Sequence, residues 1–150
     1  MMKQPRAFTL IMAILTASVM LALGYAIFNI VSKEILLSSS GRESQFAFFA
    51  ADTGIECALY WDSKFDAFST SSPLIEVSCG VASSTLTKVI SGNNATSTFS
   101  FQFSTFITRP CVTVTVAKSI PAKTKIESAG YNTCVVTNPR RIERAIRVTY

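Results

Sequence analysis

The chain of 150 residues contains no histidine, and only 15% of its residues are charged. The absence of histidine removes the commonest general base and the commonest transition-metal ligand, so histidine-dependent catalytic triads and histidine-bound metals are excluded. No charge occurs between Arg6 and Lys33, and no proline occurs between Arg6 and Pro73. These absences make an enzyme a poor expectation and leave room for one long helix that begins with an apolar stretch.

That apolar stretch is the strongest feature present. Hydrophobic residues make up 49% of the chain, and the mean hydropathy is +0.37. Residues 7–32 form a charge-free run that as a helix would measure roughly 39 Å, enough to cross a hydrocarbon core of ~30 Å. The run is longer than the core of a cleaved signal peptide, so we expect it to be retained. Lys3 and Arg6 precede it, and the positive-inside rule then places the rest of the chain outside the inner membrane.

The helical pattern continues beyond the charge-free run. Phe48, Ala51, Ile55 and Ala58 recur at spacings of three and four residues, which predicts an amphipathic helix over residues 33–61. One nearly continuous helix from residue 8 to about residue 61 is therefore expected. Its weakest part is the Ser-Ser-Ser-Gly sequence at residues 38–41, where a bend or a melted turn would be unsurprising.

All four cysteines lie beyond the apolar stretch, in a compartment where disulfides persist. They are Cys57, Cys79, Cys111 and Cys134, and no two have the close spacing of a zinc ribbon or a redox motif. We therefore expect two structural disulfides. Three connectivities are open, and the two local pairs, Cys57–Cys79 and Cys111–Cys134, are the pairing we consider first.

Residues 62–150 change to the period of β-strands and predict a β-rich head. The candidate strands are residues 74–79, 86–90, 98–107, 112–117, 135–136 and 141–149. Phe99, Phe101 and Phe103 alternate with polar residues, so three rings share one face of a sheet. We expect this face to cover the amphipathic helix, and an exposed aromatic platform for a ligand is the alternative. The predicted class is α+β, a long N-terminal helix packed on a small antiparallel sheet.

The last candidate strand carries several arginines. Its alternation places Arg144 on one face with the apolar residues Ile142, Ile146, Val148 and Tyr150. We expect Arg144 to pair with Asp52 or Glu56 of the helix. A stripe formed by Arg140, Arg141, Arg144 and Arg147 could contact nucleic acid, but Glu143 interrupts it and charge is common on edge strands. We expect nucleic acid not to be a partner.

The N-terminus resembles that of a known family. Lys3-Gln4-Pro5-Arg6-Ala7 followed by Phe8-Thr9-Leu10-Ile11 is similar to the class III signal of type IV pilins and pseudopilins. The resemblance implies that a prepilin peptidase cuts between Ala7 and Phe8 and methylates the new N-terminus. It divides the chain into a leader (residues 1–7), a membrane and filament-core helix (8–32), an amphipathic helix (33–61) and a head (62–150). By the same resemblance, Phe8, Thr9, Leu10, Ile11 and Met12 would lie in the filament core.

Two further features bear on the kind of subunit. The family normally has glutamate at the fifth mature position, where this chain has Met12, and subunits that lack this glutamate resemble minor or tip-located components. Residues 41–52, GRESQFAFFAAD, resemble the corresponding helix of PilX-type minor pilins. The alternative interpretation is a divergent filament subunit in which Met12 is simply one more apolar residue.

The leading hypothesis is therefore a minor subunit of a type IV pilus-like filament, which is held first in the inner membrane and then at the cell surface. Its partners would be the N-terminal helices of other subunits and the prepilin peptidase. The alternatives are a type II secretion pseudopilin and a single-pass anchored binding domain that does not polymerise. The acids Asp62, Asp66, Glu76, Glu127 and Glu143 are too scattered to nominate a catalytic pair, so we expect no enzymatic activity, cofactor or metal.

Overall fold

The fold comes from a computed structural model, which describes residues 6–80, 82–104, 109–119 and 123–150. Its first element is a single helix, α1 (Arg6–Phe65), so the helix ends four residues later than the sequence predicts. Residues 38–41 are helical, so this turn is not melted. The Ser40 hydroxyl donates back to the carbonyl oxygen of Leu37 at 2.9 Å, a bond within the helix that leaves its backbone ladder intact.

The helix ends at a left-handed residue. Asp66 follows Phe65 with a φ of 45°, and its backbone N–H donates to the carbonyl oxygen of Asp62 at 3.0 Å. This is the arrangement of an αL cap, which satisfies one of the last free carbonyls of the helix. Asparagine and aspartate tolerate this conformation better than most residues, so Asp66 is a suitable residue for the stop.

By its internal packing the chain divides into two units, Met1–Ser40 and Gly41–Tyr150. The first unit is the N-terminal part of α1. The second unit, which we call the head, contains the rest of the helix and all of the strands. The sequence-based boundaries at residues 32 and 61 follow hydropathy and secondary structure, whereas this division follows the packing of the chain.

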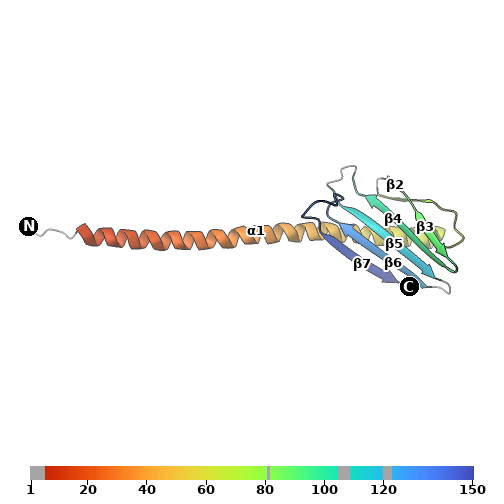
Figure 1. The fold of residues 1–150 in the computed structure, drawn as a ribbon, viewed down its shortest axis with the longest axis horizontal. Helices are drawn as coiled ribbons and strands as arrows, with labels where there is room; N and C mark the ends of the chain where they lie inside the picture. Colours follow the sequence, from red (N-terminus) through yellow and green to blue (C-terminus); the bar gives the residue numbers. More distant parts are fainter. Residues whose placement is uncertain (1–5, 81, 105–108, 120–122) are drawn as a thin grey trace, which may run out of the picture. The chain divides into compact units, whose positions relative to one another are not determined.

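The head contains two antiparallel sheets (Figure 1). A small hairpin consists of β1 (Glu76–Cys79) and β2 (Ala82–Thr85). A five-stranded meander runs in chain order from β3 to β7, and its strands are β3 (Thr87–Ser91), β4 (Asn94–Gln102), β5 (Cys111–Ser119), β6 (Lys123–Tyr131) and β7 (Glu143–Thr149). The α+β class expected from the sequence is confirmed.

The helix packs closely on one face of the meander. Ala47, Ala51, Ile55 and Ala58 are buried against it, and each exposes 5% or less of its surface. Phe48, which the spacing also assigns to this face, is instead 49% exposed. The buried stripe is centred on small residues, which bring the helix backbone close to the sheet and leave no space for a phenylalanine ring.

The core lies between this helix segment and the inward side chains of the strands. Phe99 and Phe101 are buried at 2% and 3% exposure, and Phe103 packs against them from the edge of the cluster. The rings therefore cover the helix as predicted, and the alternative of an exposed aromatic platform is wrong. Phe68, just beyond the helix, stacks on Phe99 with 5.8 Å between ring centroids and extends the core.

The strand predictions were incomplete. Two strands were missed, β2 and β6, and residues 135–136 lie in a turn region rather than in a strand. Strands β3 and β4 form an antiparallel hairpin whose turn consists of Gly92 and Asn93, since Ser91 already pairs with Asn94. Strand β4 ends at Gln102, and positions 105–107 of the predicted strand lie outside the described residues.

Candidate functional site

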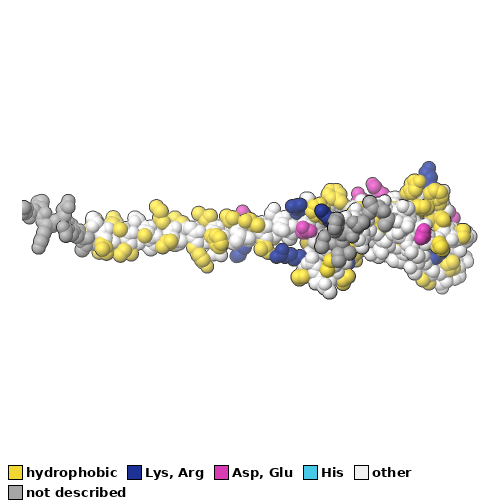
Figure 2. All heavy atoms as spheres, turned by 90° about the horizontal axis from the view of Figure 1, so that it is seen from above, with side chains coloured by type: hydrophobic (Ala, Val, Ile, Leu, Met, Phe, Trp, Pro, Cys, Tyr) yellow, Lys and Arg dark blue, Asp and Glu magenta, His cyan; other side chains and the backbone are white. Residues whose placement is uncertain are grey.

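The most distinctive surface of the N-terminal unit is apolar on every side. The large hydrophobic side chains from Phe8 to Leu37 have exposed fractions between 45% and 74%, so no face of this helix segment is buried (Figure 2). The helix is long and apolar enough to cross a membrane. A surface of this kind is stable only when lipid or another protein removes it from water.

The residues predicted for processing and filament-core packing lie at the start of this surface. Residues 1–5 of the leader lie outside the described residues, as does the side chain of Ala7. Phe8 and Met12 belong to α1 and are 61% and 51% exposed. The Thr16 hydroxyl lies one turn further on and donates to the carbonyl oxygen of Met12 at 3.0 Å, which satisfies its own polar group within the helix.

The cysteines form two local pairs, of which one is bonded. Cys57 of α1 and Cys79 of β1 form a disulfide, with 6.1 Å between their Cα atoms. Cys111 and Cys134 are free thiols in the structure, and they lie within hydrogen-bonding contact of each other. Burial and the neighbouring Cys134 raise the pKa of the Cys111 thiol to about 12. The reactive thiolate of Cys111 is therefore scarce at neutral pH.

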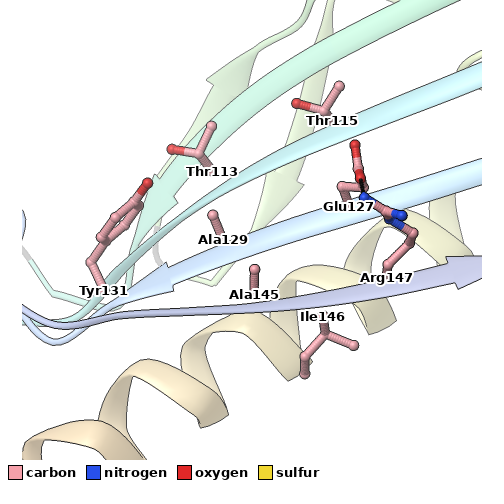
Figure 3. Close-up of a pocket in the computed structure, with 8 residues that line it drawn as sticks. All are labelled: Thr113, Thr115, Glu127, Ala129, Tyr131, Ala145, Ile146 and Arg147. Carbon is pink, nitrogen blue, oxygen red and sulfur yellow. Dashed lines mark ion pairs between the residues drawn. The ribbon is translucent and has the colours of Figure 1, made fainter.

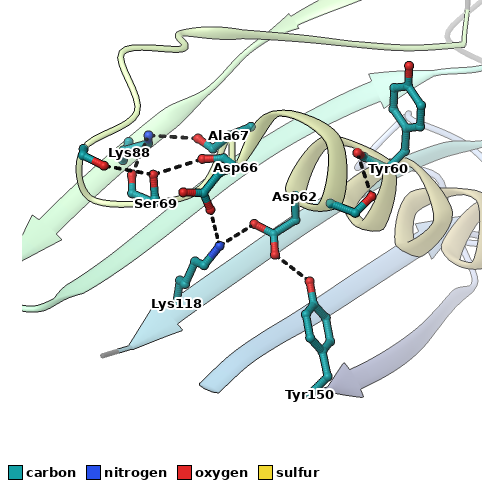
Figure 4. A network of polar contacts seen from close by, with 10 residues as sticks. Tyr60, Asp62, Asp66, Ala67, Ser69, Lys88, Lys118 and Tyr150 are labelled. Carbon is teal, nitrogen blue, oxygen red and sulfur yellow. Dashed lines mark hydrogen bonds and ion pairs between the residues drawn. The ribbon is translucent and has the colours of Figure 1, made fainter. Parts of the chain in front are cut away.

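A polar network closes the end of the helix against the sheet (Figure 4). Asp62 lies in the last turn of α1, and only 6% of its side chain is exposed. One of its carboxylate oxygens accepts a bond from Lys118 Nζ at 2.9 Å, and the other accepts a bond from the Tyr150 hydroxyl at 2.6 Å. Lys118 also binds Asp66, so one ammonium from β5 bridges two acids at the helix terminus.

The groups of this network shift one another's pKa values. Hydrogen bonding to Lys118 lowers the pKa of Asp66. Desolvation opposes the charge on Lys118, but hydrogen bonds to Asp66 and Asp62 outweigh it, and the pKa of Lys118 is raised. Burial and the Asp62 carboxylate raise the pKa of Tyr150 above its ordinary value. Asp66 and Lys118 are thus held in their charged forms, with Tyr150 as a neutral donor, which is the pattern of a structural clamp.

A second lysine caps the loop after the helix. Lys88 Nζ donates to the carbonyl oxygens of Ala67, Ser69 and Ser72 at 3.0–3.1 Å. Burial lowers the pKa of Lys88, because desolvation disfavours its charged form. The three carbonyls surround the ammonium in the way that they would surround a bound cation, so Lys88 of β3 connects this loop to the sheet.

The outer face of the meander, opposite the helix, carries a shallow groove of about 450 Å³ (Figure 3). Its floor is formed by Ala129 and Ala145. The Tyr131 ring stands at one end, and Arg147 binds Glu127 at the other. Lys125 also binds Glu127, at 3.0 Å. The polar groups at this end therefore bind one another rather than converging on a free centre.

The arginines near the last strand do not form one stripe. Arg144 donates to the Ser44 hydroxyl at 2.7 Å instead of pairing with Asp52 or Glu56, because β7 crosses the helix near Ser44 rather than farther along. Arg147 points to the outer face and binds Glu127. Arg141 lies over the Tyr131 ring, with 3.7 Å between the guanidinium carbon and the ring centroid.

Sequence reasoning missed the clamp at the helix end. It treated Asp62 and Asp66 as scattered acids, whereas Lys118 brings both together, and Tyr150 approaches from 88 positions away in the sequence. No local pattern identifies such contacts, because they depend on the order of the strands in the sheet. Within the described ranges, no group of three or more Cys, Asp or Glu side chains is arranged to hold a metal ion.

Comparison of the chain with protein-family models, with characterised proteins and with solved structures gave no match. The fold and the surfaces described above are therefore the basis for assigning a function.

Proposed function

We propose that this chain is a structural subunit of a type IV pilus-like filament, of the minor kind that aids assembly or forms the tip. The observation that carries the proposal is that one helix, α1, combines an apolar segment exposed on all sides with a segment packed on a β-meander. The first segment needs a lipid or helix environment, and the second fixes a folded head to it. The leader that resembles a class III signal is the second support.

The mechanism would rest on packing rather than on chemistry. Removal of the leader takes away Lys3 and Arg6, the two charges that hold the N-terminus at the cytoplasmic face. The helix starting at Phe8 can then leave the inner membrane and bury its apolar side chains among copies of itself. Met12 would contribute apolar contact where the family has a carboxylate, so this subunit would not need a charged partner at that depth.

The polar clamp and the disulfide have a supporting role in this proposal. Both connect the last third of α1 to the strands, through Asp62 to β5 and through Cys57 to β1. A subunit that is extracted from a membrane and added to a filament transmits force along its helix into its head. Contacts that fix the helix end would keep the head folded under that load.

Filament membership can be tested in the native organism by shearing surface filaments from cells and probing the detached fraction for this chain. The expected result is that the chain appears in that fraction when the prepilin peptidase is active and disappears when the peptidase is inactivated. A chain that stays with the membrane in both strains would contradict the proposal and favour a non-polymerising anchored domain. Retention in the envelope combined with loss of protein secretion on deletion would instead favour a type II secretion pseudopilin.

A further inference from the structure

The head carries a concentration of arginines at the end where the chain enters it from the apolar segment. We call this set the basic end; its members are Arg42, Arg109, Arg140, Arg141 and Arg144. Arg144 and Arg140 are held there by contacts with the first residues of the helix segment in the head. Arg144 Nε donates to Ser44 Oγ at 2.7 Å, and Asn132 Nδ2 bridges the Glu43 carboxylate and the carbonyl oxygen of Arg140, each at 3.0 Å.

Arg42 belongs to α1 at the start of the head, and Arg141 and Arg109 reach the same end through β5 and β6. Arg141 stacks on Tyr131, the last residue of β6, which pairs in register with Cys111 at the start of β5. The Cys134 thiol donates to the carbonyl oxygen of Arg109 and lies beside Cys111, which places Arg109 next to the same strand end. Arg42, Arg109, Arg140 and Arg144 are all exposed.

The charge of the basic end is not cancelled by its acids. The basic end contains five arginines and two acids, Glu43 and Glu143, so its net charge is 5 − 2 = +3. Glu43 is already engaged by the Asn132 amide, and Glu143 interacts with the Tyr131 hydroxyl. Neutral groups thus bond to both carboxylates. Arg109 and Arg140 are exposed, and the Arg42 guanidinium lies over the Phe46 ring, with 5.5 Å to the ring centroid.

From this placement we infer that the basic end binds the anionic phosphate headgroups of the membrane that holds the apolar segment. The inference rests on the proposed membrane anchoring but not on filament assembly. The charge-free run ends at Ser32 and the head begins at Gly41, so the helical chain between them measures about 14 Å. The headgroup layer takes up roughly 6 Å of that length, and the remaining ~8 Å is close to the Debye length at physiological salt.

The chain between the apolar segment and the head supports a lipid partner over other polyanions. Ile35, Leu36 and Leu37 follow the charges at Lys33 and Glu34, and they are 65%, 74% and 71% exposed. Three large apolar side chains beyond the expected membrane boundary favour the interfacial region, and their insertion draws the basic end towards the headgroups. Juxtamembrane basic clusters bind anionic lipids by this combination of apolar insertion and charge attraction.

The test uses the full chain reconstituted in lipid nanodiscs, either of phosphatidylcholine alone or of equal parts phosphatidylcholine and phosphatidylglycerol. Hydrogen–deuterium exchange is followed by mass spectrometry on a peptide covering residues 138–144. We expect exchange at this peptide to be slower by about fivefold or more in the anionic discs, the effect of at least one arginine–headgroup contact. Raising the salt to about 1 M, where the Debye length is about 3 Å, should abolish the difference.

Two matched variants give the result its specificity. Arg140→Gln combined with Arg144→Gln should remove the lipid-dependent protection. Lys64→Gln combined with Lys123→Gln removes the same charge from exposed positions in the last helical turn and at the first residue of β6, and it should leave the protection unchanged. Unchanged exchange in β5 and an intact Cys57–Cys79 disulfide show that each variant is folded.

Equal exchange in the two kinds of disc would overturn the inference, as would protection that survives the Arg140 and Arg144 substitutions. Protection that appears in both lipids and rises with the number of chains per disc would point to a second copy instead. Protection that appears only on addition of duplex DNA would point to nucleic acid and would equally contradict the headgroup site. A chain that fails to enter either disc contradicts the membrane anchor itself, whereas a chain that enters both without lipid dependence contradicts only this inference.

Discussion

Two glycines decide how closely the helix approaches the sheet. A Cβ atom at Gly130 would lie 2.1 Å from the carbonyl oxygen of Ala47 and 2.4 Å from the backbone nitrogen of Ala51. A Cβ atom at Gly54 would lie 2.2 Å from Ser128 Oγ. These separations are too short for any side chain. At Gly130 the helix and β6 are therefore in contact through their backbones, whereas at Gly54 the helix backbone contacts side chains of the sheet.

The first prediction follows from the contact at Gly130. Gly130→Ala should destabilise the head by about 1–3 kcal/mol, because the atoms in its way belong to the helix backbone and cannot rotate aside. The matched control is Gly41→Ala, where nothing lies within 4 Å of the new Cβ and helix propensity should add about 1 kcal/mol of stability. Urea denaturation in detergent measures both. Equal stability of the Gly130→Ala variant and the unmodified chain would show that the helix does not press on β6 as described.

The second prediction separates the two acids of the clamp. Asp62→Asn should cost about 2–3 kcal/mol, because it weakens bonds to both Lys118 and Tyr150 at a buried position. Asp66→Asn should cost less than about 1 kcal/mol, because 63% of that side chain is exposed to solvent. Urea midpoints at neutral pH give the comparison. A larger loss at Asp66 than at Asp62 would contradict the account.

The third prediction concerns alkaline pH. The folded-state pKa values of Tyr150 and Lys118 are raised above their ordinary values of 10.0 and 10.5. The protonated forms are therefore favoured by folding, so this stabilisation is full below about pH 10 and is lost as the pH rises through the raised values. Tyr131 contributes with the same sign, and Lys88, whose pKa is lowered, contributes with the opposite sign.

Tyr150→Phe provides the corresponding measurement. The variant should be less stable than the unmodified chain at neutral pH. The difference between them should shrink above pH 10, because the phenol then ionises in the unfolded chain while the folded chain keeps it protonated for its bond to Asp62. Urea titrations at a series of pH values between about 8 and 12 follow this difference. A difference that stays constant across the series would indicate that the Tyr150 bond does not depend on its proton.

At the scale of elements, the bonded cysteine pair connects the helix to the small hairpin. The Cys57–Cys79 disulfide joins residues 22 positions apart, so reduction releases a loop whose closure is worth about 3 kcal/mol. We predict a loss of about this size for Cys57→Ser combined with Cys79→Ser, measured by urea denaturation. Cys111→Ser combined with Cys134→Ser is the control, and it should be nearly neutral while that pair is reduced. A large loss in the control would mean that this second pair is also bonded in the native protein.

Elements with a strong period could be predicted from sequence, and those without one could not. The helix, the hairpin of β3 and β4, and strand β5 have clear periods and are present. Strand β6 was missed because its inward positions are Thr124, Ile126, Ser128 and Gly130, which are small or polar where the helix backbone approaches. A strand that faces a closely packed helix in this way lacks the alternation by which strands are recognised.

The features of the candidate site likewise differ in whether the sequence predicts them. The apolar surface from Phe8 onwards could be read directly from the sequence, because it depends on a continuous run of residues. The contacts of Asp62 with Lys118 and Tyr150, and of Arg144 with Ser44, join positions between 56 and 100 residues apart. They depend on strand order and register, which sequence patterns in one chain do not determine.

At the scale of the whole molecule, the two units have different requirements. Among the residues that the structure describes, every buried hydrophobic side chain belongs to the head, from Ala47 to Ile126. The N-terminal unit instead exposes apolar side chains throughout the described part of its helix. Most of the exposed large hydrophobic side chains among the described residues thus belong to the N-terminal unit.

We therefore predict that a chain beginning at Gly41 folds without detergent. It retains the core, the clamp and the Cys57–Cys79 disulfide, and it should unfold in urea as a single cooperative transition. Circular dichroism and size-exclusion chromatography check folding and solubility, with the full chain in detergent as the reference. Aggregation of the shortened chain, or a broad non-cooperative transition, would show that the head depends on the apolar segment for its stability.

The most direct test of the proposed function is the intact mass of the protein purified from its native membrane, measured with and without reduction. The account predicts a chain that begins at Phe8 and carries one additional methyl group. Reduction should add two hydrogens for Cys57–Cys79, and four if Cys111 and Cys134 have also been oxidised in the envelope. A mass that begins at Met1 or Met2 would contradict processing as a pilin and would leave a membrane-anchored β domain that keeps its leader.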